Sequence, residues 1–344
     1  MVDPVAPRAA AKTAPRSIAR PPILVAGYPR ATPGQTSVAD LVARAANSSY
    51  SDAMPEQLLG PTSQSFISQR LRLNYVDWGN PGAPPLILVH GGRDHCRNWD
   101  WVAADLRRDY HIIAPDLRGH GDSAWSESGD YSLSAFVYDL AQLIHQQRLA
   151  PCRIVAHSLG GSIALRYAGA FPETVSKLVS IEGLGPSPTM MADRAQRGPV
   201  ERTRTWVAET RRLAARIPRR YPTLEDAFHR MQAENKHLTE EQARYLTLHG
   251  AMQNEDGTYS WKFDNYVRSF SPVDLGEGEL QELWRNIACP ILFANGKESW
   301  ASNPEKDGRM QYFRDGRVVE FEGAGHWVHH DRLEAFVETV RGFL

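Results

Sequence analysis

Residues 154–161 read IVAHSLGG, and this stretch decides the fold of the chain. A short β-branched run ends at Ser158, two glycines follow, and a helical pattern begins at Ser162. This layout is typical of a nucleophile elbow, a tight strand-to-helix turn that presents a hydroxyl at the edge of a sheet. Small neighbours are needed at such a strained turn, and Gly160 meets that need. Ala156 stands where the G-x-S-x-G pattern has its first glycine, so the match is near rather than full.

Strand and helix signals alternate on both sides of this elbow. Two runs at 66–70 and 71–78 resemble paired strands closed by a turn at 79–82. Continuous apolar runs, which are expected of strands covered on both faces, lie at 86–89, 111–114, 177–181, 290–294 and 318–321. Helical spacing of apolar residues is seen around 136–144, and an amphipathic helix is expected at 333–343. The alternation predicts an α/β fold, with a mostly parallel central sheet and helices on both faces.

The alternation of strand and helix signals divides the chain of 344 residues into three parts. Residues 1–64, rich in Ala, Pro and Arg, are predicted to be a poorly ordered extension, with a targeting segment as the alternative. Residues 65–183 and 285–344 carry the alternating pattern and form the predicted core. Residues 184–284 are helix-like and arginine-rich, and they interrupt the sheet pattern. We interpret this segment as a helical cap inserted into the core.

Composition limits the classes of partner. The formal net charge of -1 gives no electrostatic reason to expect nucleic acid or an anionic membrane surface. No apolar run approaches the ~20 residues of a membrane span. Cys96, Cys152 and Cys289 lie far apart without metal-ligand spacing, and their odd number argues against a disulfide framework. We expect no cofactor and no metal, and a cytoplasmic location; the sequence leaves the oligomeric state open.

A serine hydroxyl is a weak nucleophile and needs a base within hydrogen-bond reach, itself oriented by a third group. The best candidate base is His326, within Gly-Ala-Gly-His-Trp at 323–327, just beyond the last apolar run. Two carboxylates between Ser158 and His326 follow predicted strands and are candidates for the orienting acid: Glu182 and Glu298. The residues themselves do not decide between these two.

Acyl transfer also requires donors for the oxyanion that forms, and fixed backbone N–H groups supply them at low reorganisation cost. The elbow geometry offers the N–H of Leu159. A second donor is expected after the run at 86–89, where His-Gly-Gly-Arg occupies residues 90–93. We choose Gly92 for this donor, with Arg93 as the alternative.

These motifs together resemble the α/β-hydrolase superfamily, over about residues 66–344. Residues 116–123, DLRGHGDS, look like the D-x-R-G-x-G-x-S loop of that superfamily, in which this loop is structural. The resemblance implies the chain order serine, acid, histidine. Most members place the acid at the location after Glu298, where this chain has Ser299 and Trp300. Haloalkane dehalogenases show that a glutamate at the Glu182 location can serve, so both carboxylates stay open.

What the resemblance implies is a serine hydrolase that cleaves a small carboxylic ester through an acyl-enzyme intermediate. Hydrolysis of a C–C bond and perhydrolase activity use the same triad and are the alternatives within enzymes. A ligand-binding protein of the same fold without useful turnover is the alternative outside them.

The predicted cap would form the roof of the pocket and set specificity. A cluster of arginines in the cap has two interpretations. Either it binds a substrate carboxylate, or it forms a solvated face of a helix. The cluster consists of Arg211, Arg212, Arg216, Arg219 and Arg220.

Overall fold

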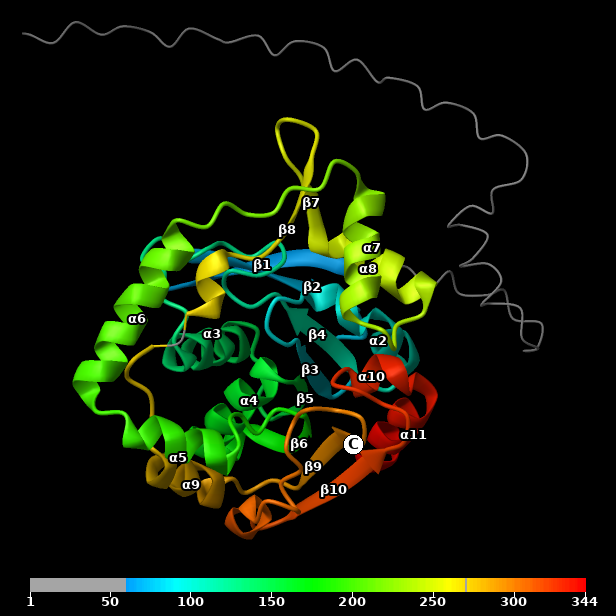
Figure 1. The fold of residues 1–344 in the computed structure, drawn as a ribbon. Coiled ribbons are helices and arrows are strands. Elements are labelled where there is room, and N and C mark those ends of the chain that lie inside the picture. The colour runs from blue at the N-terminus through cyan, green and yellow to red at the C-terminus, as the bar shows by residue number, and fades with distance from the viewer. Residues whose placement is uncertain (1–59, 270) are drawn as a thin grey trace, which may run out of the picture. The chain divides into compact units, whose positions relative to one another are not determined.

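A computed structural model describes residues 60–269 and 271–344, and a central sheet of eight strands organises this part of the chain (Figure 1). The predicted extension lies almost wholly outside the described residues, apart from the start of the first strand. The sheet contains β1 (Thr62–Ser68), β2 (Leu71–Asp77), β3 (Pro85–Val89), β4 (His111–Pro115), β5 (Cys152–His157), β6 (Val175–Ile181), β9 (Ile291–Gly296) and β10 (Gly316–Phe321).

The strand order is β1-β2-β4-β3-β5-β6-β9-β10. β1 and β2 form an antiparallel hairpin, and β2 pairs antiparallel with β4. All pairings from β4 to β10 are parallel. The carboxyl ends of these strands therefore meet at one edge of the sheet, which is where α/β proteins place their ligand sites. The predicted α/β architecture is confirmed.

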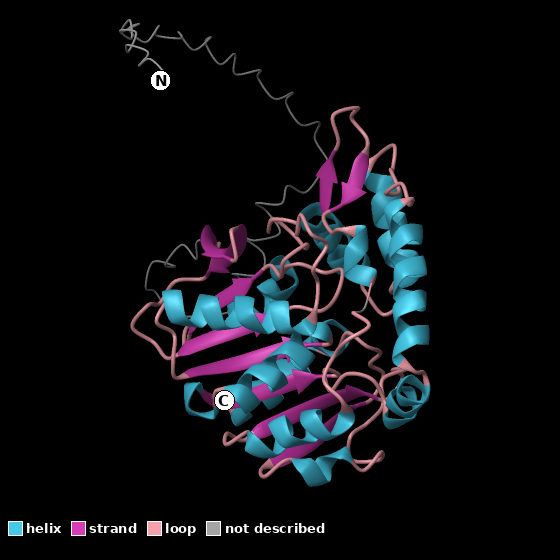
Figure 2. Cartoon of the chain, turned by 90° about the vertical axis from the view of Figure 1, so that its left-hand side faces the viewer, coloured by secondary structure: helices cyan, strands magenta, loops and turns pink. Residues whose placement is uncertain are grey.

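Helices cover both faces of the sheet because alternate strand residues point to opposite sides. On one face Ile87, Ile154 and Leu178 belong to a core shared with α3 (Leu133–Gln146), α4 (Leu159–Ala170) and α9 (Glu277–Asn286). On the other face their neighbours Leu88, Val155 and Val179 pack with α2 (Asp100–Leu106) and α11 (Leu333–Phe343). Figure 2, viewed from the side of α3 and α4, shows helices crossing in front of the strands.

The segment between β6 and β9 is mostly helical, as the sequence predicts. It contains α5 (Pro188–Gln196), α6 (Pro199–Ala214), α7 (Leu224–Glu234), α8 (Glu240–Gly250), the hairpin of β7 (Ala251–Gln253) and β8 (Tyr259–Trp261), and the 3-10 helix η3 (Asn265–Arg268). The short hairpin and η3 were not expected. α9, the last element of the segment, packs on α4 through the core residues Leu280 and Trp284. The division into core and cap stays a prediction.

None of the described helices has the length and apolar character needed to span a membrane. All three cysteines are buried as free thiols.

Candidate active site

Ser158 lies in a sharp turn between β5 and α4. Its backbone adopts φ 50° and ψ -114°, a left-handed conformation that is uncommon for a residue with a side chain and is concentrated at functional sites. The Ser158 N–H donates to the carbonyl of Ile181 at 2.8 Å, which fixes the turn to the end of β6. The side chain is half-buried and lines a cavity. These are the features of the predicted nucleophile elbow.

Glycines allow the close packing around this turn. A Cβ on Gly160 would lie 2.5 Å from the Val89 carbonyl oxygen and 2.6 Å from that of His90. A Cβ on Gly161 would lie 2.5 Å from the Cα of Gly183. Larger residues at either position would push α4 away from the ends of β3 and β6, and with it the serine.

His326 reaches the same edge of the sheet from the loop that follows β10. Gly323, at φ +64°, turns this loop, and the Gly325 N–H donates to the Asp331 carboxylate at 2.8 Å. The imidazole is half-buried, and its Nδ1 lies 2.5 Å from Oε2 of Glu182. With Nδ1–H donated to a carboxylate, the free lone pair of the neutral ring is on Nε2.

Glu182 follows β6 directly and holds its side chain completely buried behind the imidazole. Two further donors bind the carboxylate, the Gly296 N–H at 2.8 Å and the Ser299 hydroxyl at 2.5 Å. Because a buried carboxylate is costly unless its oxygens are hydrogen-bonded, these donors stabilise the Glu182 side chain where it faces His326. Its backbone also has a positive φ of 48°, a second strained residue at this edge.

Glu298, the other candidate acid, is not brought to the imidazole of His326. Its exposed carboxylate lies 3.8 Å from the Nε2 of His237, on the segment that links α7 and α8. The structure thus brings Glu182 and His326 together, and it places Glu298 at the rim of the cavity.

The two candidate oxyanion donors lie next to Ser158. Leu159 opens α4, and first-turn N–H groups have no partner within their own helix. Gly92 approaches Leu159 closely enough that a Cβ on it would lie 3.8 Å from the Leu159 side chain. Buried His90 holds this loop: it accepts from the Leu117 N–H at 2.9 Å and contacts the Gly91 carbonyl at 2.7 Å. Burial lowers the pKa of His90 to about 4, so the ring is neutral and its Nδ1–H donates to Gly91.

A cavity of about 1470 Å³ opens in front of these groups. Ser158, His326, Leu159 and Gly92 line it, together with residues from the helices α3, α4, α5, α7 and α9, from β8 and from η3. The volume exceeds that of typical small-molecule pockets, which suits an extended substrate.

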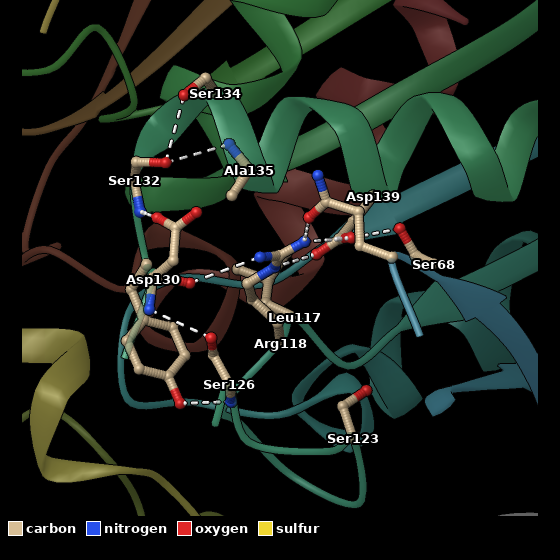
Figure 3. Close-up of polar contacts among 12 residues, drawn as sticks. Ser68, Leu117, Arg118, Ser123, Ser126, Asp130, Ser132, Ser134, Ala135 and Asp139 are labelled. Atoms are coloured by element: carbon tan, nitrogen blue, oxygen red, sulfur yellow. Dashed lines mark hydrogen bonds and ion pairs between the residues drawn. The ribbon is translucent and has the colours of Figure 1, made fainter. Parts of the chain in front are cut away.

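Loop 116–123 supports the site from behind. Asp116 accepts hydrogen bonds from the Cys96 and Asp122 N–H groups at 2.7 and 2.9 Å. The Arg118 guanidinium binds both carboxylate oxygens of Asp139 on α3, and Ser68 donates to the same carboxylate at 2.5 Å (Figure 3). Every one of these contacts is internal to the fold, in agreement with the structural part expected for this loop.

A family model described as the alpha/beta hydrolase family matches residues 86–339. The chain belongs to this family. Two curated relatives are similar over most of the α/β hydrolase region. The esterase Rv0045c of Mycobacterium tuberculosis is 28% identical over 294 residues, covering 83% of this chain and 90% of the relative. The sn-1-specific diacylglycerol lipase ABHD11 of Xenopus laevis is 28% identical over 274 residues, covering 77% of this chain and 81% of the relative.

Solved structures of the family superpose well. A structure of the Mycobacterium tuberculosis esterase matches with a TM-score of 0.66 at 26% identity, covering 83% of this chain and 92% of the esterase. The thioesterase domain from the curacin biosynthetic pathway matches with a TM-score of 0.71, covering 82% of this chain and 100% of that domain. At 22% identity the second match shows the common α/β hydrolase fold alone.

Sequence reasoning missed several residues that shape this α/β hydrolase site. Buried His157 bonds through Nε2 to the His326 carbonyl at 3.0 Å, so it fixes the loop that carries the imidazole. Ser299 stands where the family usually has its acid and instead donates to Glu182. Trp300 is 79% exposed, and its ring centroid lies 4.7 Å from that of His326. Of these residues, only His157 has a signal in the sequence, because it directly precedes Ser158. Ser299 and Trp300 contact Glu182 and His326 across separate loops.

Among residues 60–269 and 271–344, no group of three or more His, Cys, Asp or Glu side chains is arranged to hold a metal ion.

Proposed function

We propose that this protein is a serine hydrolase that cleaves carboxylic esters through an acyl-enzyme intermediate. The observation that carries the proposal is the hydrogen bond between His326 and Glu182, because His326 lines the same cavity as the strained Ser158. A nucleophile, a base and an orienting acid are the parts that this chemistry requires. The relatives named as an esterase and a diacylglycerol lipase support an ester as the substrate.

In this mechanism the Ser158 oxygen bonds to the ester carbonyl carbon while its proton passes to Nε2 of His326. Glu182 holds the ring in the required tautomer and stabilises the imidazolium that forms. The N–H groups of Leu159 and Gly92 donate to the oxyanion. The C–O bond then breaks, and the alcohol leaves with the proton from His326. A water deprotonated by the same histidine attacks the acyl-enzyme, which releases the carboxylic acid and regenerates the serine.

Labelling with a fluorophosphonate probe tests this proposal. We expect wild-type protein to be labelled at Ser158, the Ser158→Ala variant to remain unlabelled, and 4-nitrophenyl esters to be turned over only by the wild type. Equal labelling of both proteins, or of neither, would overturn the proposal. Absence of labelling would favour a ligand-binding role for the cavity.

A further inference from the structure

The cavity in front of Ser158 carries more positive than negative charge. Its cationic lining residues are Arg93, Arg166, Arg194, Arg216, Arg219, Arg230, Lys236 and Arg268. Its acidic lining residues are Glu234, Asp274, Glu279, Glu298 and Asp331. Each of the acidic groups has a partner among the described residues.

Ion pairs and hydrogen bonds occupy these carboxylates. Glu234 pairs with Arg230, and Asp274 lies 3.3 Å from Arg166. Glu298 lies 3.8 Å from His237. The remaining two accept backbone N–H groups: Glu279 from Gly276 at 2.6 Å, and Asp331 from Gly325 at 2.8 Å.

Four arginines of the lining have no such partner, and one of them, Arg219, packs over the ring of Tyr221 at 5.8 Å. Across residues 60–269 and 271–344, the guanidinium groups of Arg93, Arg216 and Arg268 form no ion pair and no hydrogen bond. Arg268 packs over the ring of Phe263 at 5.3 Å, and its Nε is buried without a partner. A buried donor left unsatisfied is costly, and it marks a position where a ligand atom would be stabilised.

Arg93, Arg216 and Arg268 belong to separate elements that line the same cavity. Arg268 ends η3, and Asn265 of η3 donates to the Arg216 carbonyl at 3.3 Å. η3 is in turn anchored to loop 116–123 by the bond from the Asp264 N–H to the Gly119 carbonyl. Arg93 directly follows Gly92 in the oxyanion loop and has a positive φ of 63°.

Electrostatics agrees with this arrangement. Burial first, and then the positive charges of Arg93 and Arg216, lower the pKa of the Arg268 guanidinium. The carboxylate of Glu234 opposes this shift as the smallest of the causes. The like charges of the three arginines repel one another, and a planar oxyanion accepting paired N–H bonds would relieve that repulsion.

We propose that Arg93, Arg216 and Arg268 form an anion subsite, and that the substrate is an ester or thioester bearing a carboxylate or phosphate group. This inference rests on the proposed function and adds a substrate class to it. The reacting carbonyl would lie at Ser158, and the charged group would lie against the three guanidiniums in the same cavity.

A pair of esters matched in length tests the carboxylate arm. We expect 4-nitrophenyl hydrogen adipate to have a lower KM than 4-nitrophenyl hexanoate with wild-type protein. Arg268→Gln and Arg216→Gln should each raise the KM for the adipate ester by about tenfold relative to the hexanoate, because each removes a charge-assisted bond. Arg216 is exposed, so its variant tests the subsite without disturbing packing. Arg212→Gln is the matched control, because Arg212 is an exposed arginine of α6 that is not among the residues lining the cavity.

A thioester pair tests the phosphate arm. S-Butanoyl-4'-phosphopantetheine and S-butanoyl-pantetheine share the reacting group and differ in one phosphate. A preference for the phosphorylated thioester that is lost in Arg268→Gln assigns the subsite to phosphate, and a preference confined to the adipate ester assigns it to carboxylate. Equal kinetics within both pairs in the wild type would overturn the proposal.

Binding to the Ser158→Ala protein separates this proposal from the proposed function. Calorimetry would compare adipamic acid with neutral hexanamide. Binding of the acid alone, lost in Ser158→Ala/Arg268→Gln, supports the subsite even when wild-type protein fails to react with fluorophosphonate. If fluorophosphonate labels the wild-type protein and adipamic acid and hexanamide bind equally to Ser158→Ala, the proposed hydrolase function is supported and the anion subsite is overturned.

Discussion

Nδ1 of His326 lies 2.5 Å from Oε2 of Glu182, although the two residues are 144 positions apart in the chain. Strand pairing produces this contact. β6 pairs with β9, and β9 with β10, so the loops that follow these strands open at one edge of the sheet. Ser158 reaches the same edge from β5, which pairs with β6 on the other side. The candidate site is therefore a product of register in the central sheet.

Replacing Glu182 by glutamine should lower kcat for a 4-nitrophenyl ester by about 10³- to 10⁴-fold, as an amide at the acid position of a triad imposes the wrong tautomer. Glu298→Gln should leave kcat close to the wild-type value because Glu298 is exposed and contacts His237. Steady-state kinetics on the two variants make the comparison. Mild and equal losses would show that neither residue is the orienting acid.

Ser299→Ala should lower kcat by about tenfold, since it removes a hydrogen bond to the Glu182 carboxylate, and bonds to charged groups are worth about 1.5–3 kcal/mol. The loss should fall on kcat rather than KM because Ser299 acts through Glu182. Ser299→Thr keeps the hydroxyl and should recover most of the activity. If Ser299→Thr is as impaired as Ser299→Ala, steric fit at the loop is the cause.

Gly296→Ala should both destabilise the protein and reduce its activity. The added Cβ would lie 2.2 Å from the Gly325 carbonyl oxygen and 2.5 Å from that of Ala324, in the loop that carries His326. Gly278→Ala is the control: its Cβ meets nothing within 4 Å, and alanine in α9 should stabilise by about 0.5 kcal/mol. Thermal unfolding of both variants tests the pair, and a Gly296→Ala protein with wild-type Tm would contradict it.

The free energy of unfolding should fall as the pH falls from about 7 to 5. Burial lowers the pKa of His90 to about 4, and that of His120 and His330 to about 3, from 6.5. The unfolded chain therefore binds more protons than the folded protein between these values, and each such histidine contributes a slope of up to about 1.4 kcal/mol per pH unit. Urea unfolding at pH 7.5, 6 and 5 measures it.

Asp94 acts in the opposite direction. Burial raises its pKa to about 7 from 3.8, so the folded protein binds the extra proton and gains stability as the pH falls through this range. Asp94→Asn removes this titration while keeping an acceptor for the His95 N–H at that position. The variant should thus lose stability more steeply on acidification than the wild type. Parallel curves for the two proteins would show that Asp94 does not titrate in this range.

Local patterns were sufficient to predict the fold. The apolar runs at 86–89 and 111–114 became β3 and β4, and the amphipathic run at 333–343 became α11. Each pattern depends on which of its own residues are buried, and this burial is visible in the spacing of apolar residues along the chain. The hairpin β7–β8 escaped prediction because its strands have three residues each, too few for alternation to be recognised.

The candidate site was harder to predict. Ser158 carries its signal in adjacent residues, and the glycines around His326 mark its loop. The choice between Glu182 and Glu298 depends on which loop turns toward the imidazole, and the positive φ of Glu182 and the bond from Ser299 decide that direction. Both are tertiary properties, and neither leaves a periodic trace in the sequence. Arg268 likewise joins Arg93 only through the folded path of the chain.

Direct pairing of β6 with β9, through Leu178 opposite Ile291, means that the intervening chain leaves the sheet and returns to the adjacent strand. The part of this segment before α9 can consequently vary in length without changing the pairing of the strands that precede Ser158, Glu182 and His326. A lineage could remodel the part of this segment before α9, and with it the arginines Arg216 and Arg268, while the strand ends at the candidate site stay in place. Substrate preference is then free to diverge faster than chemistry.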